Sequence, residues 1–381
     1  MALNNYKLVK MGYILMNMTK FGFLSLGLIG GSIAMAIKNV HPNAEIVAYA
    51  RKESTLQEAL DAGVIDVGTT TIDDTFLNCD IIFLCAPVAV NNQFLSQLLP
   101  HISEHTILTD VGSVKGSIHK VAESLGLNKQ FIGGHPMAGS EKTGFANANP
   151  MILENAYYIL TPTDEVPKDA IDAYHTLVKE MGAIPLILNC AEHDYVTAAI
   201  SHVPHLVAAA LANLVHDHDT AEGTMKLVAA GGFKDITRIA SSSPDMWESI
   251  CMSNTENIAN LLDDYIASLQ EISTAVREGK KGYTFDLFTA SKEYRDSFAN
   301  QPRGPIKKVY ICYVDIPDQA GAIATTALIL ANNKISIKNI GIVHNREFEE
   351  GVLQIEFYDQ HALDSATSLL QSLQYTVYER K

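Results

Sequence analysis

Cysteine and tryptophan are scarce in this sequence, which has five cysteines and one tryptophan among its 381 residues. The cysteines are odd in number and scattered, and no two of them have the C-x-x-C spacing typical of disulfide frameworks and zinc sites. They are Cys79, Cys85, Cys190, Cys251 and Cys312. This pattern argues against a disulfide-stapled scaffold and against a zinc module, and it predicts reduced thiols in a cytoplasmic protein.

Positive charge is also in short supply. The chain has 28 Lys and Arg residues against 43 Asp and Glu residues, and its formal net charge is -15 at pH 7. A nucleic-acid-binding protein needs stripes of basic residues that face the phosphates, and no such stripe is evident. The sequence therefore argues against a nucleic-acid partner.

Long apolar runs are missing as well. No segment reaches the roughly 18 apolar residues that span a bilayer, so no membrane partner is expected. The early stretch KLVKMGYILMNMTK has Lys7 and Lys10 before an apolar patch, but Asn17 interrupts the patch and no small-residue cleavage site follows. We interpret residues 1–17 as an N-terminal extension, with Met18 as a candidate initiator.

The composition that remains is that of a folded globular protein, with 47% hydrophobic and 19% charged residues. The length predicts two or three domains. From 18 to 189, short β-branched runs alternate with helical patterns, which predicts βαβ units and a mostly parallel sheet covered on both faces. The expected strands lie in KFGFLSL, AEIVAYA, CDIIFLCAPV, HTILTDV, QFIGGHP, AYYILTP and AIPLILN.

The character of the sequence changes after Cys190. From 190 to 299 only helix-period stretches are evident, and their apolar faces predict a helical domain that self-associates, most simply as a homodimer. Residues 300–306, around NQPRGP, read as a linker. Residues 307–381 follow the order β-α-β-β-α-β, which predicts a small ferredoxin-like α+β domain.

The stretch FGFLSLGLIGGSIAM outlines a strand, a glycine turn and a helix, as in a Rossmann-like dinucleotide-binding domain. The first glycine of G-x-G-x-x-G is missing, because Ser25 occupies its position. The later glycines still allow close approach to a pyrophosphate at the helix N-terminus, although a plain turn that ends a strand is the alternative. Cofactor contacts are expected from Ser25, Gly27, Leu28, Ile29 and Gly30.

The end of the second strand decides which dinucleotide fits. Ala50 stands where an acidic residue would bond the adenosine ribose, and Arg51 follows it. Arg51 is either a solvated surface charge or a partner for a 2′-phosphate. We therefore expect NAD as the cofactor, with unusual tolerance of NADP. Ala86 and Pro87, after another strand, are expected to line the same site.

Two motifs follow strands whose carboxyl ends carry the chemistry of doubly wound sheets: TDVGSVKGSI and GGHPMAGSEKTG. His135 lies in the second motif, between glycines and Pro136, and is a candidate general base. Ser113 lies in the first and is a candidate partner that shares a proton with His135. The alternatives are a structural histidine and an ordinary helix N-cap serine.

Histidines also gather in the helical region. SHVPH places His202 and His205 on one helix face if Pro204 does not break the helix. HDHD, at 216–219, makes a metal site worth considering, but we expect this segment to cap a helix end in water and predict no metal.

A basic pair follows in GGFKDITRIASSSPDMW, where Lys234 and Arg238 are four residues apart. Two cations on one helix face can clamp a dicarboxylate, although a solvated basic face is the alternative.

Together these motifs resemble the prephenate/arogenate dehydrogenase family of tyrosine biosynthesis. The glycine loop, GSVKG, GGHPMAGSEKTG, SHVPH, GGFKDITRIA and PDMW occur in the family's order, over about Phe21 to Phe298. The C-terminal part resembles an ACT domain, a small-molecule sensor of amino-acid metabolism, with DIPDQAGAIA as its ligand-loop signature. Ser25 and Ala50 are departures from the family pattern, and both concern the fit of the cofactor.

The resemblance implies the oxidative decarboxylation of prephenate to 4-hydroxyphenylpyruvate. His135 would draw off the ring hydroxyl proton while hydride leaves for the nicotinamide, and Ser113 would hold the two groups in register. Arg238 would bind a substrate carboxylate, with Lys234 close by. The other substrate-binding or gating residues that we expect are His205, Ser140, Glu141, Gly231 and Trp247.

The resemblance also implies feedback control. L-tyrosine is the expected effector of the ACT domain, bound at the loop Asp318, Gln319, Ala320 and Gly321. Three alternatives remain: arogenate as the substrate, a dinucleotide-bound sensor that has lost catalysis, and a β-hydroxyacid dehydrogenase of similar architecture. The His135, Ser113 and Arg238 set argues against the sensor, and SHVPH stands where a β-hydroxyacid dehydrogenase has its catalytic lysine.

Overall fold

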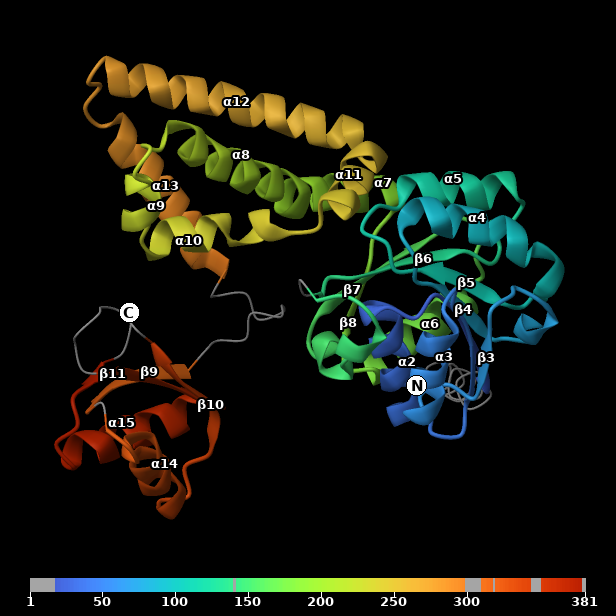
Figure 1. Cartoon of the computed structure of the whole chain (residues 1–381), viewed down its shortest axis with the longest axis horizontal. Coiled ribbons are helices and arrows are strands. Elements are labelled where there is room, and N and C mark those ends of the chain that lie inside the picture. The colour runs from blue at the N-terminus through green and yellow to red at the C-terminus, as the bar shows by residue number, and fades with distance from the viewer. Residues whose placement is uncertain (1–17, 140–141, 299–309, 318, 344–350, 379–381) are drawn as a thin grey trace, which may run out of the picture. The chain divides into compact units, whose positions relative to one another are not determined.

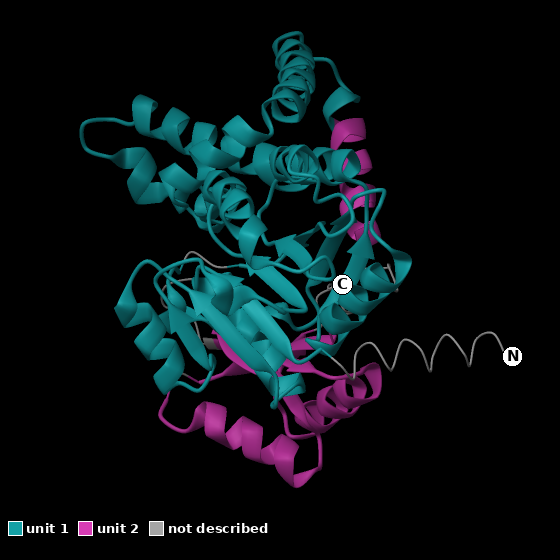
Figure 2. Ribbon diagram, turned by 90° about the vertical axis from the view of Figure 1, so that its right-hand side faces the viewer, with its two compact units in different colours: residues 1–284 teal, residues 285–381 magenta. Residues whose placement is uncertain are grey.

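The computed structural model describes residues 18–139, 142–298, 310–317, 319–343 and 351–378 (Figure 1). The chain divides into two compact units, residues 1–284 and 285–381 (Figure 2). The division falls inside a helix, α13 (Tyr283–Ser297), and the domain borders expected from the sequence remain predictions. Ser140, Glu141 and Asp318 lie outside the described residues.

A five-stranded parallel sheet is the core of the first unit, with the strand order β3-β2-β1-β4-β5. Helices cover both faces of this sheet (Figure 1). The strands are β1 (Lys20–Leu24), β2 (Glu45–Tyr49), β3 (Val67–Thr69), β4 (Ile81–Leu84) and β5 (Ile107–Asp110). The helices are α2 (Leu28–Val40), α3 (Glu53–Asp61), α4 (Val88–Leu98) and α5 (Gly116–Ser124). The doubly wound sheet predicted from the sequence is confirmed, and β3 is a strand that the sequence analysis missed.

Aromatic residues fill the centre of this sheet. Phe23 on β1 and Phe83 on β4 are fully buried and stack with their ring centroids 4.9 Å apart. Burying each ring stabilises the fold by about 1.5–3 kcal/mol, and the stacked pair helps to hold β1 beside β4. The pairing of β1 with β2 on one side and with β4 on the other creates a topological switch point at their carboxyl ends.

A second sheet of three strands, in the order β6-β7-β8, extends the first. Its strands are β6 (Ile132–Pro136), β7 (Tyr157–Pro162) and β8 (Ile184–Ile187), with α6 (Lys168–Glu180) between the last two. A parallel bridge between Leu108 and Phe131 joins the sheets, so β6 ends at the same edge as β5. β6 and β7 are antiparallel. The sequence predicted a mostly parallel sheet and did not identify which strands depart from that direction. The short 3-10 helices are η1 (Asp74–Phe76), η2 (Leu99–His101), η3 (Phe145–Asn147) and η4 (Pro150–Leu153).

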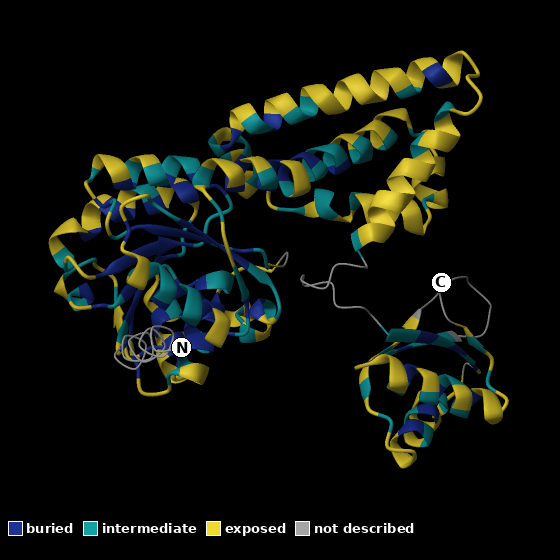
Figure 3. Cartoon of the chain, turned by 180° about the vertical axis from the view of Figure 1, so that it is seen from behind, coloured by how far each residue is buried: buried dark blue, intermediate teal, exposed yellow. Residues whose placement is uncertain are grey.

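Residues 190–298 contain no strand and form the predicted helical region. Its elements are α7 (Cys190–Thr197), the π-helix η5 (Ala198–His202), α8 (Val203–His218), α9 (Thr224–Val228), α10 (Gly231–Thr237), η6 (Arg238–Ser241), α11 (Pro244–Ser253) and α12 (Thr255–Arg277). Most of α12 is exposed (Figure 3). Its exposed side chains include Ile266, Leu269 and Val276, which leaves apolar surface for another chain to cover.

The run Cys190–His218 is the one helical stretch in the described residues that is long and apolar enough to cross a membrane by length and composition. The expectation that no segment reaches this length is therefore wrong by that criterion, because η5 joins α7 and α8 into one continuous helix. The same stretch contains the buried polar side chains of His193, Asp194 and His202. These side chains bond to other protein groups, as described below, whereas only 22% of the stretch's most apolar window is buried.

The second unit contains a four-stranded antiparallel sheet in the order β10-β11-β9-β12. Its elements are β9 (Tyr310–Ile316), α14 (Ala322–Asn332), β10 (Ile337–Val343), β11 (Gly351–Phe357), α15 (Gln360–Ser372) and β12 (Val377–Tyr378). Both helices contribute to one hydrophobic core with the sheet through Leu330, Ala366 and Leu370. The predicted β-α-β-β-α-β order is confirmed.

Candidate active site

Ser25 explains how the turn after β1 forms without its glycine. Its backbone has φ +79°, in the left-handed region that glycine enters freely and that costs other residues about 1–2 kcal/mol. The N–H of Ser25 donates to Tyr49 O at 2.8 Å, which ties the turn to the end of β2. The tight turn of a dinucleotide-binding loop is therefore retained, at the cost of backbone strain.

The N-terminus of α2 can receive a pyrophosphate. Gly27 is the N-cap, no side chain caps the helix, and its first turn has no acidic residue. The first intrahelical bond runs from Gly31 N–H to Gly27 O, at 2.9 Å, so the preceding amides have no helical acceptor. No atom lies within 4 Å of the position that a Cβ on Gly27 would take, so the helix end is open to a ligand.

Gly30 is needed for close packing behind this loop. A Cβ there would lie 2.8 Å from Ser25 O and 2.9 Å from Cys85 Cβ, closer than side-chain atoms normally approach. The helix can therefore approach β4 only because this residue has no side chain. The glycine arrangement fits NAD better than it fits a plain turn.

The other predicted cofactor residues follow strands that end at the same edge. Ala50 follows β2 and is buried, whereas Arg51 is exposed. Ala86 and Pro87 follow β4, where Ala86 N–H donates to Asn91 Oδ1 at 3.0 Å and Pro87 is the N-cap of α4. The structure thus brings together the residues expected to line the dinucleotide.

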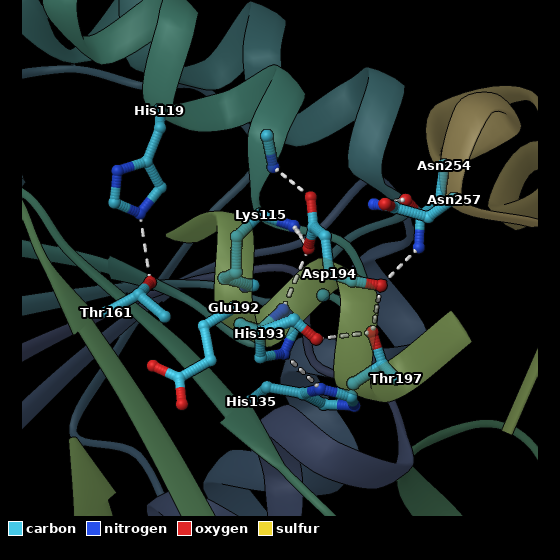
Figure 4. Close-up of polar contacts among 12 residues, drawn as sticks. Lys115, His119, His135, Thr161, Glu192, His193, Asp194, Thr197, Asn254 and Asn257 are labelled. Atoms are coloured by element: carbon cyan, nitrogen blue, oxygen red, sulfur yellow. Dashed lines mark hydrogen bonds and ion pairs between the residues drawn. The ribbon is translucent and has the colours of Figure 1, made fainter. Parts of the chain in front are cut away.

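His135 lies on β6, which ends at the same edge as β5, and it begins a chain of hydrogen bonds (Figure 4). Its Nδ1 is 2.8 Å from Nε2 of His193, and Nδ1 of His193 is 2.8 Å from Oδ1 of Asp194. His193 and Asp194 lie on α7 and are both buried. Neither residue belongs to a motif that the sequence alone identifies.

Asp194 is held by backbone donors from the other side. Its Oδ1 accepts the N–H of Lys115 and its Oδ2 accepts the N–H of Gly116, each at 2.8 Å. Its backbone carbonyl accepts Asn254 Nδ2 at 2.7 Å. These bonds fix the carboxylate at the start of α5, where the helix dipole also favours negative charge.

A buried ion pair lies beside this chain. Lys115 Nζ is 2.5 Å from Asp110 Oδ2 and 2.6 Å from Gly134 O, and both charged side chains are almost fully buried. Asp110 also accepts the N–H of Gly112 at 2.9 Å and the N–H of Gly134 at 3.3 Å. The pair thus ties β5, β6 and the start of α5 together one residue before His135.

The electrostatics of the chain keep the imidazoles neutral. Burial lowers the pKa of His135 well below its usual value, and the neighbouring His193 and Lys115 lower it further. Burial likewise lowers the pKa of His193. Burial opposes ionisation of Asp194, but hydrogen bonds from His193 and from the amides of Lys115 and Gly116 outweigh it, so the pKa of Asp194 is lowered.

Ser113 lies in the bend between β5 and α5 and is half-buried. It is not a helix N-cap, because Lys115 occupies that position for α5. The described partner of His135 Nδ1 is His193, so a contact with Ser113 would have to be made at the other ring nitrogen or through the substrate. The role of Ser113 remains a prediction.

In the helical region the predicted residues lie on elements that pack together. His205 on α8 stacks on Trp247 of α11 with their ring centroids 3.9 Å apart, and His202 lies 6.1 Å from the same ring. The pKa of His205 is lowered mainly by burial, and the charge of Arg238 on η6 contributes to the lowering. Arg238 and His205 therefore lie on elements that pack together, and their role in substrate binding remains a prediction.

The remaining predicted substrate residues lie on α10, which Gly231 begins and on which Lys234 is exposed. Pro204 does not break the helix, because it directly follows the π-helix η5 and α7, η5 and α8 continue through it as one helix. The segment HDHD ends α8 in an exposed position, as predicted, and Asp219 accepts the N–H groups of Met225 and Lys226.

A parallel sheet with an open helix N-terminus at its switch point, and a neutral histidine at the same edge, defines a nicotinamide-dinucleotide-dependent dehydrogenase. Residues 33–186 match the family model of the prephenate dehydrogenase nucleotide-binding domain, and residues 189–290 match that of the prephenate dehydrogenase dimerization domain. The chain belongs to the prephenate dehydrogenase family. Its C-terminal β-α-β-β-α-β domain is ACT-like.

Individual relatives agree with this assignment. The chain is 40% identical to prephenate dehydrogenase of Bacillus subtilis (strain 168) over 87% of this chain and 90% of the relative. It is similar to the crystal structure of prephenate dehydrogenase from A. aeolicus in complex with hydroxyphenyl propionate and NAD+, with a TM-score of 0.70, 31% identity, and coverage of 74% of this chain and 99% of that chain. The chain is also similar to the crystal structure of Synechocystis arogenate dehydrogenase, with a TM-score of 0.67 and 28% identity. The match covers 74% of this chain and 100% of that chain.

Proposed function

We propose that this NAD-dependent oxidoreductase converts prephenate to 4-hydroxyphenylpyruvate by oxidative decarboxylation, in L-tyrosine biosynthesis. The observation that carries the proposal is the half-buried His135, whose pKa is lowered, at the sheet edge where α2 presents its open N-terminus. The 40% identity to a Bacillus subtilis prephenate dehydrogenase supports the reaction. A catalytic base that is neutral at physiological pH can accept a proton there.

In this reaction His135 accepts a hydrogen bond from the ring hydroxyl of prephenate and takes its proton. When bound, NAD+ supplies the acceptor for the hydride that leaves the carbinol carbon. The bond to the ring carboxylate breaks, carbon dioxide leaves, and the electron pair of that bond completes the aromatic ring. The proton held by His135 returns to the ring oxygen, which gives the phenol. Burial disfavours the imidazolium that forms on His135, so this step needs groups that compensate the new positive charge.

The substrate would be held from the helical region. Arg238 binds a carboxylate of prephenate with its planar guanidinium, and Lys234 adds positive charge to the same side. The stacked pair His205 and Trp247 offers a flat surface for the substrate ring. The further contacts that we propose are Ser113, Gly231, Ser140 and Glu141.

Arogenate is the second candidate substrate, since a relative of 28% identity is an arogenate dehydrogenase. It differs from prephenate by an amine in place of the keto group. The family match to a dimerization domain supports a homodimer formed through the helical region. The scattered cysteines favour a cytoplasmic location for this enzyme. We further propose L-tyrosine as the effector of the ACT-like domain, bound near Gln319, Ala320 and Gly321.

A steady-state assay with prephenate and arogenate, each with NAD+ and NADP+, tests the reaction and ranks the substrates. His135→Asn should lower kcat by about 10²–10⁴ while NAD+ affinity stays nearly unchanged, because the base acts only in the hydride-transfer transition state. The matched control is His41→Asn, since His41 is a half-buried histidine bonded to Glu180 at the C-terminus of α2, the opposite end of that helix from its open N-terminus. A His135→Asn enzyme that keeps about a third of wild-type turnover contradicts the assignment.

A further inference from the structure

We propose that His193 and Asp194 are positioning residues that fix His135 in the tautomer whose Nε2 is unprotonated and free to accept the substrate proton. The inference rests on the proposed function, because it assigns a role to two residues in the same reaction. It starts from the hydrogen-bonded chain His135–His193–Asp194 (Figure 4).

The direction of the chain is set at Asp194. The carboxylate is buried and accepts backbone N–H groups from Lys115 and Gly116, one on each oxygen. A carboxylate with two such donors is ionised and has only acceptor capacity left. The ring nitrogen of His193 at 2.8 Å must therefore be an N–H donor, so Nδ1 of His193 carries the hydrogen.

The tautomer of His193 then determines that of His135. A neutral imidazole carries one hydrogen, so Nε2 of His193 is an acceptor. It lies 2.8 Å from Nδ1 of His135, which must donate. Nε2 of His135 is left with its lone pair, as a general base requires. A cationic His193 would reverse this bond, but the ring is fully buried and its pKa is lowered by that burial.

The hydrogen-bonded chain also stabilises the positive charge that forms on His135 during the reaction. Once His135 has taken the substrate proton, it is an imidazolium that donates Nδ1–H more strongly to His193, which in turn donates to the fixed Asp194 carboxylate. The Lys115 charge nearby is already paired with Asp110, so Asp194 is the anion available to this chain. In serine proteases, where an aspartate orients a catalytic histidine directly, loss of the carboxylate lowers kcat about 10⁴-fold.

The test compares two substitutions of His193 in the full-length enzyme. His193→Leu removes the acceptor, whereas His193→Gln keeps an amide oxygen for His135 Nδ1 and an amide N–H for Asp194. We expect His193→Leu to lower kcat about 10²-fold or more with KM within about threefold, and His193→Gln to recover at least about tenfold of that loss. His41→Leu and His41→Gln are the matched controls, with kcat near wild type for both, because His41 is bonded to Glu180 at the C-terminus of α2.

A second readout measures the tautomer itself. ¹⁵N NMR of the enzyme labelled at histidine, with the His135 signal identified by its absence in His135→Asn, should show Nδ1 protonated in the wild type and a mixture of tautomers in His193→Leu. Equal losses of kcat in the Leu and Gln variants, or an unchanged His135 tautomer in His193→Leu, overturn the proposal. A wild-type enzyme inactive on both substrates would instead refute the proposed function, and the NMR experiment would still report on the chain.

Discussion

Ala50 is the residue at which the choice of cofactor is made. It is buried directly after β2, where an aspartate would bond the ribose hydroxyls of NAD+ and repel a 2′-phosphate. Arg51 is exposed beside it and can pair with such a phosphate. The site should therefore tolerate NADP+ more than relatives that have the acidic residue.

Ala50→Asp should raise kcat/KM for NAD+ and lower it for NADP+, because the carboxylate gains two hydroxyl donors and adds repulsion toward the phosphate. Initial rates at varied concentrations of each cofactor measure both effects. Ala50→Asn is the control, since it offers a hydrogen-bond acceptor of the same size without the charge. If the wild type shows no turnover with NADP+, Arg51 is only a surface charge and does not pair with a 2′-phosphate.

Individual residues could be predicted from the sequence where the backbone conformation restricts which residue type fits. The glycine loop predicted a dinucleotide site although Ser25 replaces a glycine, and the structure shows the serine in the glycine's own conformation, at φ +79°. His193 was not predicted, because its neighbour in space, His135, is 58 residues away in the chain. An adjacent His-Asp pair at the start of a helix after a strand was the available signal, and it is common at ordinary helix starts.

Among the elements, α5 is fixed to the sheet by the buried Lys115–Asp110 pair at its start. Burial lowers the pKa of Lys115, while the charge of Asp110 and its hydrogen bond oppose that shift. Removal of one partner from such a pair leaves an uncompensated charge in the protein interior. The start of α5 also supplies the two amides that hold Asp194, so its position matters to the histidine chain.

Lys115→Met should lower the free energy of unfolding by about 3–5 kcal/mol, because Asp110 is then buried without its counterion. Urea denaturation followed by circular dichroism measures the change. Lys120→Met, on the exposed side of the same helix, is the matched control and should change stability by no more than about 0.5 kcal/mol. A loss below about 1 kcal/mol for Lys115→Met would mean that water or a shift of the helix compensates the carboxylate.

Most elements were predictable because their patterns are local. Alternating apolar runs identified every strand of the first unit except β3, which has three residues and only partial burial. The antiparallel pairing of β6 with β7 depends on how the connection between them runs, and the spacing of apolar residues does not predict it. The π-helix η5 was not predicted either, because it depends on an extra residue in one helical turn. His202, at its end, is buried, and its Nδ1 lies 3.3 Å from Nδ2 of Asn254.

At the scale of the whole molecule, the ACT-like domain should make the enzyme sensitive to L-tyrosine. Gly321 has φ +92° at the start of α14, so the loop before this helix forms a glycine turn whose backbone amides can receive a carboxylate. Deletion of residues 306–381 should leave an active enzyme that tyrosine no longer inhibits. The match to the A. aeolicus prephenate dehydrogenase structure covers 99% of that chain but only 74% of this one. That relative thus forms the matched fold with a shorter chain.

A pair of substitutions separates this effect from tyrosine competing at the active site. Gly321→Asp should abolish inhibition by repelling the tyrosine carboxylate, whereas Gly321→Asn, which tolerates the same backbone conformation without charge, should retain part of it. Inhibition constants from steady-state kinetics measure both. If the truncated enzyme is inhibited as strongly as the full chain, tyrosine acts outside the ACT-like domain.

Asp194 has one more consequence, which is mechanical. Its side chain is bonded to the start of α5 and its carbonyl to Asn254, so it lies where the helical region joins the cofactor-binding sheet. A rotation about this point displaces atoms in proportion to their distance from it. α12, which starts beside Asn254, is roughly 35 Å long, so a tilt of about 5° moves its far end by about 3 Å and the bonds at Asp194 hardly at all. A tilt of the helical region about Asp194 would therefore leave His135 aligned while it widened or narrowed the space around the substrate.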